Sequence, residues 1–171
     1  MNLPEERKAH CDLDTSGRCE LDENLEIFSR VPVFSGIPAQ RLRVYAYLSR
    51  RAHYSPGEFL FRQGDRDNKG YIVISGRVQM IREYREHSLI LKEIQEGEFF
   101  GGLALLSDIR RLFSARAMDP LDCLTVDRES FQKLVVQFPE VAIKSIDIMI
   151  RRIVEMEEKL LETKIQECVY G

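Results

Sequence analysis

Cysteine and histidine are the residue types in this sequence that could hold a metal ion. The cysteines are Cys11, Cys19, Cys123 and Cys168. Seven residues separate the first two, and that spacing matches no common zinc or cluster pattern. The three histidines are scattered along the chain. We therefore expect free thiols and no metal site.

Patterns that support catalysis are missing from the sequence. It contains no Gly-x-Ser-x-Gly turn, no phosphate-binding P-loop and no paired-histidine motif. Its acidic residues are spread over predicted helix faces and form no recognisable catalytic pair. The sequence therefore predicts no enzyme and no catalytic residue.

Length and composition set the class of protein. The 171 residues are 44% hydrophobic and 31% charged, as in one globular domain with a buried core. A net charge of −3 gives no general attraction to nucleic acid or to anionic membranes. No apolar stretch approaches the ~20 residues that cross a bilayer, and the N-terminus is too polar for a secretory signal. We expect a cytoplasmic chain without membrane contact.

The middle of the chain, from about residue 51 to 127, carries the signals of short strands. Strand-forming residues fill 59–61, 71–74 and 123–127, and glycine turns such as Ser75-Gly76 separate them. Little helical periodicity lies between them. Many short strands joined by turns predict a small barrel or sandwich.

Helical periodicity flanks this region on both sides. Residues 20–30 and the segment after Pro38 place apolar residues on one face, and residues 128–138 do the same after the last strand. Residues 1–19 contain a charge run and a turn sequence, and we interpret them as loosely ordered.

The last helix is predicted to be long, because residues 140–166 contain neither Gly nor Pro. Its apolar residues step by four and three, as in the seam of a coiled coil. The seam comprises Ala142, Ile146, Met149, Ile153, Met156, Leu160 and Thr163. A second stripe comprises Ile150, Val154, Leu161 and Ile165. We expect one stripe to pack on the strand region and the other on a second copy, with Ile146, Met149, Ile153, Met156 and Leu160 of the seam as the dimer interface; packing within one chain is the alternative.

The order of these elements resembles the cyclic-nucleotide-binding domain of the CRP/FNR regulators, cyclic-nucleotide-dependent kinases and gated channels. The stretches YSPGEFLFRQGD, KGYIVISGRVQMI, EGEFFGGLALLSDIRRLFSARAMD and CLTVDRESFQKLV carry the resemblance, which covers residues 31 to about 165. It implies a mainly-β α+β fold: a jelly-roll-like β-roll (a double-stranded β-helix) with N-terminal helices and a long C-terminal dimerisation helix.

The third of these stretches resembles the family's phosphate-binding cassette. In such a cassette a short helical turn directs backbone N–H groups at an anion, glycines allow close approach, and a buried arginine pairs with the cyclic phosphate. The resemblance places the turn at Gly101, Gly102, Leu103 and Ala104, and the arginine at Arg111, with Arg110 as its neighbour.

Two departures from the family's pattern change what the cassette is expected to bind. Gly102 stands where the family has a glutamate that receives the ribose 2′-hydroxyl, and Leu112 and Phe113 replace a hydroxyl residue and an alanine. Each lost charged hydrogen bond costs ~1.5–3 kcal/mol. The implied ligand is cyclic AMP, cyclic GMP or another cyclic nucleotide or dinucleotide, and a degenerate, empty pocket is the alternative.

The cysteines leave one further alternative, a redox or metal sensor. FNR-type relatives hold an iron–sulfur centre on an N-terminal cysteine cluster and a later cysteine. This sequence offers only Cys11 and Cys19 near its N-terminus, and no role for them follows from it.

Together these patterns divide the chain into an N-terminal extension (1–30), a cyclic-nucleotide-binding-like roll (31–138) and a dimerisation helix with a tail (139–171). The expected function is a homodimeric regulatory sensor for a phosphate-bearing nucleotide. The alternatives are a non-binding roll used for docking and the N-terminal part of a CRP/FNR-type transcription regulator. The sequence ends where a helix-turn-helix domain would begin, so these residues are expected to make no nucleic-acid contact.

Overall fold

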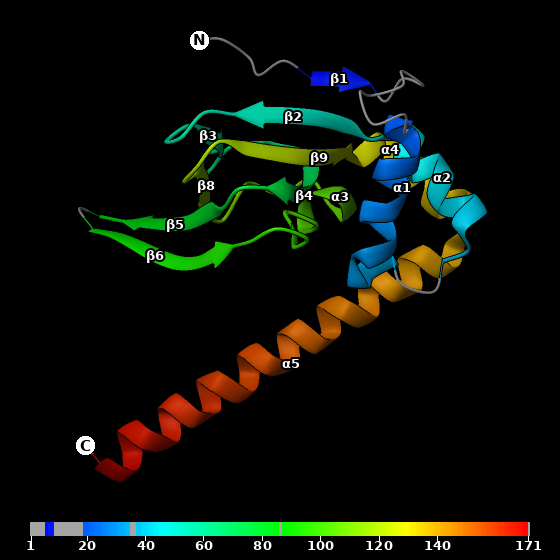
Figure 1. The fold of residues 1–171 in the computed structure, drawn as a ribbon. Helices are drawn as coiled ribbons and strands as arrows, with labels where there is room; N and C mark the ends of the chain where they lie inside the picture. The colour runs from blue at the N-terminus through cyan, green and yellow to red at the C-terminus, as the bar shows by residue number, and fades with distance from the viewer. Residues whose placement is uncertain (1–5, 9–18, 35–36, 86, 171) are drawn as a thin grey trace.

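The computed structural model describes residues 6–8, 19–34, 37–85 and 87–170, and it shows a β-roll with helices at one end (Figure 1). The strands are β1 (Glu6–Lys8), β2 (Arg50–Tyr54), β3 (Phe59–Phe61), β4 (Lys69–Ser75), β5 (Val78–Tyr84), β6 (His87–Ile94), β7 (Phe99–Phe100), β8 (Ser114–Ala117) and β9 (Leu121–Asp127). The helices are α1 (Glu20–Arg30), the 3-10 turn η1 (Pro32–Phe34), α2 (Ala39–Leu48), α3 (Leu103–Leu106), α4 (Arg128–Gln137) and α5 (Pro139–Tyr170).

The strands form two antiparallel sheets. One has the order β1-β2-β9-β4-β7 and the other the order β3-β8-β5-β6. Apolar side chains from both sheets, including Val73, Val78 and Ala115, share one core cluster, because alternate residues of each strand face the inside of the roll. The mainly-β roll expected from the sequence is confirmed.

The helices at the end of the roll share a second core cluster. In it the ring centroids of Phe28 and Phe34 lie 5.0 Å apart, and those of Phe34 and Tyr45 lie 5.2 Å apart. Leu134 of α4 belongs to the same cluster. The predicted amphipathic helices are present, and α1 packs on α2 and shares this core cluster with α4, although the division of the sequence places α1 in the N-terminal extension.

Strands β1 and β2 were not anticipated. Residues 6–8 form β1, which pairs antiparallel with β2, so the expectation of a loosely ordered segment over 1–19 is wrong at these three positions. Cys11 and the turn predicted at 14–17 lie outside the described residues. In β2, Ala52 and Tyr54 face the core, and the strand has no other apolar residue, so its apolar pattern was too short to be recognised.

Helix α5 leaves the roll after its first turns and extends away from it (Figure 1). Val141 and Ser145 are buried, whereas both apolar stripes are largely exposed farther along the helix. The exposed members are Ile146, Ile150, Ile153, Val154, Met156, Leu161, Thr163 and Ile165. Met149 is partly buried, and the side chain of Leu160 lies outside the described residues. The expectation that one stripe packs on the roll is wrong, because the helix axis diverges from the sheets.

Within the described part of the chain, no helix combines the length and the apolar character that crossing a membrane requires.

Candidate functional site

The glycine-rich turn between β7 and α3 is the first component of the candidate site. Gly101 has a φ of +78°, a conformation that residues with a side chain rarely adopt. A Cβ atom at Gly101 would lie 2.9 Å from Nη1 of Arg111 and 3.2 Å from the carbonyl oxygen of Lys69. Glycine at this position therefore permits both the turn and the close approach of the arginine.

Arg111 is the second component, and it is only 6% exposed. Its Nη1 donates to the carbonyl oxygen of Gly101 at 3.0 Å, and its Nε donates to Oδ2 of Asp67 at 3.1 Å. Nη2 donates to the same carboxylate oxygen and to the carbonyl oxygen of Lys69. The guanidinium thus has a carboxylate and two carbonyl groups of its own chain as partners. These contacts offset the free-energy cost of burying its charge.

Aromatic rings surround this ion pair. The guanidinium carbon of Arg111 lies 4.0 Å from the centroid of the Phe61 ring and 5.8 Å from that of Tyr71. Tyr71 stacks on Phe100 with centroids 5.2 Å apart, and its hydroxyl donates to Asp67 Oδ2 at 3.0 Å. These rings hold the guanidinium plane by cation–π contact and shield the ion pair from water.

The tyrosine is held in its protonated form. Burial, with the Asp67 carboxylate as a smaller contributor, raises the pKa of Tyr71 above its usual range. Tyr71 therefore remains a hydrogen-bond donor to Asp67 at ordinary pH. Together Tyr71, Asp67 and Arg111 form a closed network beneath the glycine-rich turn.

The remaining candidate residues of the turn differ in their hydrogen bonds and in their exposure. In the turn, the Ala104 amide already donates to the carbonyl oxygen of Gly101 at 3.1 Å, and the carbonyl of Gly102 accepts from Leu105 at 3.0 Å. Leu103 is 48% exposed.

The residues that follow Arg111 face different surroundings. The ring centroid of Phe113 lies 5.9 Å from that of Phe61, so Phe113 extends the aromatic wall inside the roll. Leu112 is 57% exposed, and its carbonyl accepts from Arg82. Arg110 is exposed and donates to the Gly64 carbonyl oxygen at 2.9 Å, so of the two arginines it is Arg111 that reaches the cassette.

Sequence reasoning missed Asp67, Phe61 and Tyr71 as members of the site. A buried arginine requires a carboxylate or a bound anion, so an acidic partner could be expected, but this requirement does not identify Asp67. Asp67 lies in the irregular segment before the buried strand β4, and the fold brings this segment close to the cassette. The pairing joins residues 44 positions apart, which periodicity cannot predict.

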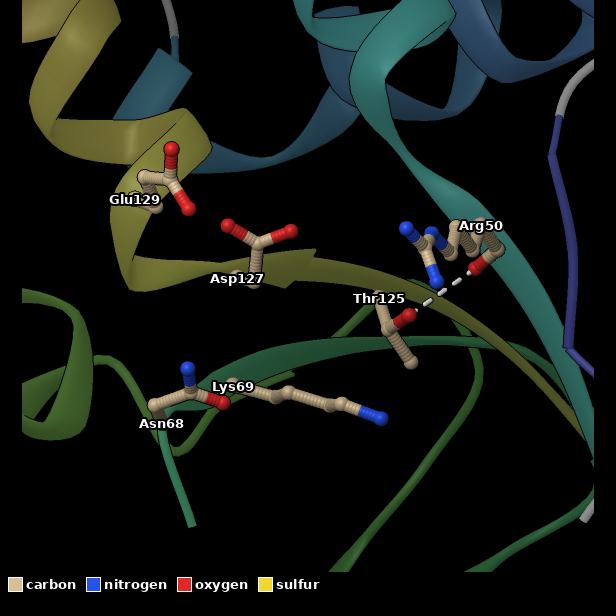
Figure 2. A pocket seen from close by; sticks show the side chains of 6 residues that line it. All are labelled: Arg50, Asn68, Lys69, Thr125, Asp127 and Glu129. Atoms are coloured by element: carbon tan, nitrogen blue, oxygen red, sulfur yellow. Dashed lines mark hydrogen bonds between the residues drawn. The ribbon is translucent and has the colours of Figure 1, made fainter.

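A separate polar hollow of about 330 Å³ lies beside the start of α4 (Figure 2). It is lined by Arg50, Asn68, Lys69, Thr125, Asp127 and Glu129. Asp127 Oδ1 accepts from the Ser130 amide at 2.8 Å and thereby caps α4. Figure 2 shows the Asp127 and Glu129 carboxylates on one side of the hollow and the basic side chains of Arg50 and Lys69 on the other.

Two cysteine side chains, Cys19 and Cys123, are among those that the structure describes, and neither forms a hydrogen bond or an ion pair with the Arg111 guanidinium; Cys123 shares the core cluster of Phe61 and Tyr71. Cys123 is fully buried in the roll, and burial raises the pKa of its thiol. Cys19 precedes α1, and neither thiol takes part in a disulfide. In the part of the chain that the structure describes, no three His, Cys, Asp or Glu side chains gather as a metal site would require.

Comparison with known proteins matches the fold to one family. The family model of the cyclic nucleotide-binding domain matches residues 51–138, about half of the chain. The "Cyclic AMP receptor protein" of Thermus thermophilus is 30% identical over 132 residues, which are 75% of this chain and 60% of that protein. A cGMP-dependent protein kinase of Caenorhabditis briggsae is 30% identical over 114 residues, 65% of this chain but only 15% of the kinase.

Solved structures agree with this assignment. The crystal structure of the Thermus thermophilus catabolite activator protein superposes with a TM-score of 0.73 at 28% identity, covering 80% of this chain and 64% of that one. The chain thus spans less than two thirds of the length of each of these relatives. The matched segment contains both sheets of the roll except β1, together with the cassette and α4. This chain therefore belongs to the cyclic nucleotide-binding domain family.

Proposed function

We propose that this chain is a regulatory sensor whose roll takes up a cyclic nucleotide, with the cyclic phosphate held by Arg111 and the turn from Gly101 to Ala104. One observation carries the proposal: a nearly buried guanidinium lies against the carbonyl of a left-handed glycine at the start of α3. A charged fork in this position suits an anion that presents two oxygen atoms.

Asp67 sets the condition under which this site works. Its carboxylate already pairs with Arg111, so an incoming phosphate competes with Asp67 or displaces it from the guanidinium. Gly102 supplies no side chain for a ribose hydroxyl. We therefore expect weak binding of ordinary cyclic AMP and cyclic GMP, and we keep other cyclic nucleotides and dinucleotides as candidates.

The proposed output is a change in the packing of α4 and α5. A ligand shifts such an equilibrium only by its difference in affinity for the two arrangements. We infer a homodimer formed through α5, because Ile146, Ile153 and Met156 are 52%, 52% and 68% exposed on one side of that helix. The proposal also keeps the cytoplasmic location that the sequence predicts.

The same network supports a second candidate, a roll that binds no ligand. Here Asp67 takes the part of the phosphate permanently, the aromatic rings Phe61, Tyr71 and Phe113 fill the roll, and the chain serves in dimerisation or docking. Because the Arg111 ion pair is internally complete, this candidate requires no effector.

Thermal unfolding of the full chain with millimolar cyclic AMP, cyclic GMP or cyclic dinucleotides separates the two candidates. A ligand at ~100 times its dissociation constant adds ~2.7 kcal/mol, and this corresponds to a midpoint shift of roughly 5–10 °C for this length. The shift should vanish in the double variant Asp67→Asn/Arg111→Met and persist in Lys133→Met, a control on the exposed face of α4. No shift with any of these ligands would favour the non-binding roll.

A further inference from the structure

Arginine side chains on one part of the roll form no ion pair with any carboxylate that the structure describes. Elsewhere the exposed arginines of the described chain do form ion pairs; they are Arg30, Arg43, Arg66, Arg77 and Arg151. Arg62, Arg85 and Arg110 are exposed without such a partner, and the half-buried Arg82 and Arg116 share this property. We call these five residues the arginine surface.

Two members of the arginine surface share one aromatic ring. The guanidinium carbon of Arg62 lies 3.8 Å from the centroid of the Phe59 ring, and that of Arg116 lies 6.0 Å from it. Arg116 also donates to Oε1 of Gln79 at 2.8 Å. Strands β3 and β8, which carry Phe59 and Arg116, lie toward the end of the roll away from α1 and α2 (Figure 1). The ring and the amide position the guanidinium groups but leave their charge uncompensated.

Hydrogen bonds bring the segments that carry the other members together. Arg110 donates through Nη1 to the carbonyl oxygen of Gly64, in the loop after β3. In the same loop, Gln63 accepts at Oε1 from the amide of Glu83 at 2.9 Å and donates through Nε2 to the carbonyl oxygen of Glu83 at 3.1 Å. The loop after β3, the end of β5 and the loop before β8 therefore form one continuous region.

Exposed apolar side chains lie among these arginines. Leu112 is 57% exposed, and its carbonyl oxygen accepts from Arg82. Tyr84 is 63% exposed, and the guanidinium carbon of Arg85 lies 5.3 Å from the centroid of its ring. Tyrosine and arginine are enriched where proteins contact one another, and they contribute much of the binding free energy there. This composition indicates contact with another protein.

Charge decides which class of partner fits the arginine surface. The planar fork of an arginine binds a carboxylate through two parallel hydrogen bonds. Three exposed carboxylates, those of Asp65, Glu83 and Glu93, belong to the same region, so it is not uniformly basic. They would repel the closely spaced phosphates of a nucleic acid or an anionic membrane. Separated carboxylates on a protein segment can each face one arginine.

We propose that the arginine surface docks an acidic segment of another protein. The carboxylates of that segment pair with the arginines, and an apolar side chain of the segment packs on Leu112 and Tyr84. This inference goes beyond the proposed function and is independent of it, since it requires the exposed arginines and no bound nucleotide.

Fluorescence anisotropy of a labelled synthetic peptide of repeated Glu-Glu-Leu units tests the proposal with the full chain. We expect binding that weakens as the salt concentration rises, because exposed charges are screened. The triple variant Arg62→Gln/Arg82→Gln/Arg110→Gln should weaken this binding by about tenfold or more, because it removes several charged hydrogen bonds. Leu112→Ser should weaken it by about three- to tenfold through the loss of apolar contact.

A matched control separates docking from general attraction. Arg30→Gln/Arg43→Gln/Arg151→Gln removes the same net charge outside the arginine surface, at side chains that are all more than half exposed. It should change the affinity by less than about twofold. Equal weakening by the two triple variants would overturn the proposal. If the first triple variant does not fold, Arg62→Gln and Arg110→Gln replace it singly, and each should weaken binding by about threefold or more.

The other possible occupants are distinguished in the same experiment. Tighter binding of a single-stranded oligonucleotide, or of vesicles of phosphatidylcholine and phosphatidylserine, than of the peptide at equal salt would overturn the proposal. Loss of self-association in the triple variant, measured by sedimentation, would also overturn it, because the partner would then be a second copy. Absence of peptide binding at millimolar concentration would reject it. Weakening by the triple variant and by Leu112→Ser, with the control unchanged, would support it.

Discussion

The cassette and helix α5 differ in whether their side chains have partners within the same chain. In the cassette, the buried charge of Arg111 finds a carboxylate, two carbonyls and an aromatic ring within the same chain. On α5, apolar residues such as Ile153 and Met156 remain more than half exposed. The contrast teaches that the cassette is complete within one chain, whereas the apolar surface of α5 gains stability only from contact with something else.

The largest effect that this comparison predicts is at Arg111. Replacing it with alanine leaves the Asp67 carboxylate without its counter-charge, and we expect the free energy of unfolding to fall by about 3–5 kcal/mol. Urea denaturation measures this loss. The double variant Asp67→Asn/Arg111→Met removes both charges and should recover a substantial part of it. An equal loss in both variants would show that the ion pair does not stabilise the cassette.

A smaller effect is expected at Gly101, where backbone conformation and contact act together. Gly101→Ala bears the strain of a positive φ, about 1–3 kcal/mol, and it also pushes against Arg111. Gly97 has a φ of +79° but no atom within 4 Å of an added Cβ, so Gly97→Ala bears the strain alone. Thermal unfolding of both variants isolates the contact. Identical losses would mean that Arg111 moves aside without cost.

Asp127, the N-cap residue of α4, lies along the chain between the cassette and α5. Removing its side chain should lower the free energy of unfolding by less than the changes at Arg111 and Gly101 do. Asp127→Ala removes the acceptor of the Ser130 amide, and we expect a loss of about 0.5–2 kcal/mol. Glu129→Ala serves as the control, because Glu129 lies two residues farther along and its side chain is exposed. It should change the free energy of unfolding by less than about 0.5 kcal/mol. Urea denaturation compares them, and equal values would show that the cap does not stabilise α4.

The smallest effect on folding is expected on α5, although its effect on association is large. Ile153→Glu should change the unfolding free energy of the dilute monomer by less than about 0.5 kcal/mol, because Ile153 is 52% exposed. In the proposed dimer it places a charge in the apolar seam and should abolish association. Sedimentation measures the mass, with Glu155→Gln as the control. If the native chain is monomeric at high concentration, the proposed dimer through α5 is wrong.

Much of the roll could be predicted from the sequence, and the failures have a common cause. The strand at 71–74 was identified from its run of strand-forming residues, and the helix at 20–30 from the helical spacing of its apolar residues. Strand β2 escaped because only Ala52 and Tyr54 of its five residues are apolar, and β1 is only three residues long. The exposed course of α5 could not be predicted, since an apolar stripe looks the same whether it packs on its own chain or on another.

For the site, resemblance of the cassette motif singled out Arg111 and Gly101, and the structure brings these two into direct contact. It could not find Asp67, because a carboxylate 44 positions away becomes a partner only when β3 and β4 are placed beside the cassette. The sequence by itself determined most of the elements, since local periodicity and turn residues act over a few positions. Only the tertiary structure decided the partners of the buried charge, because the electrostatic and hydrogen-bond energy that fixes them depends on distances in space and not along the chain.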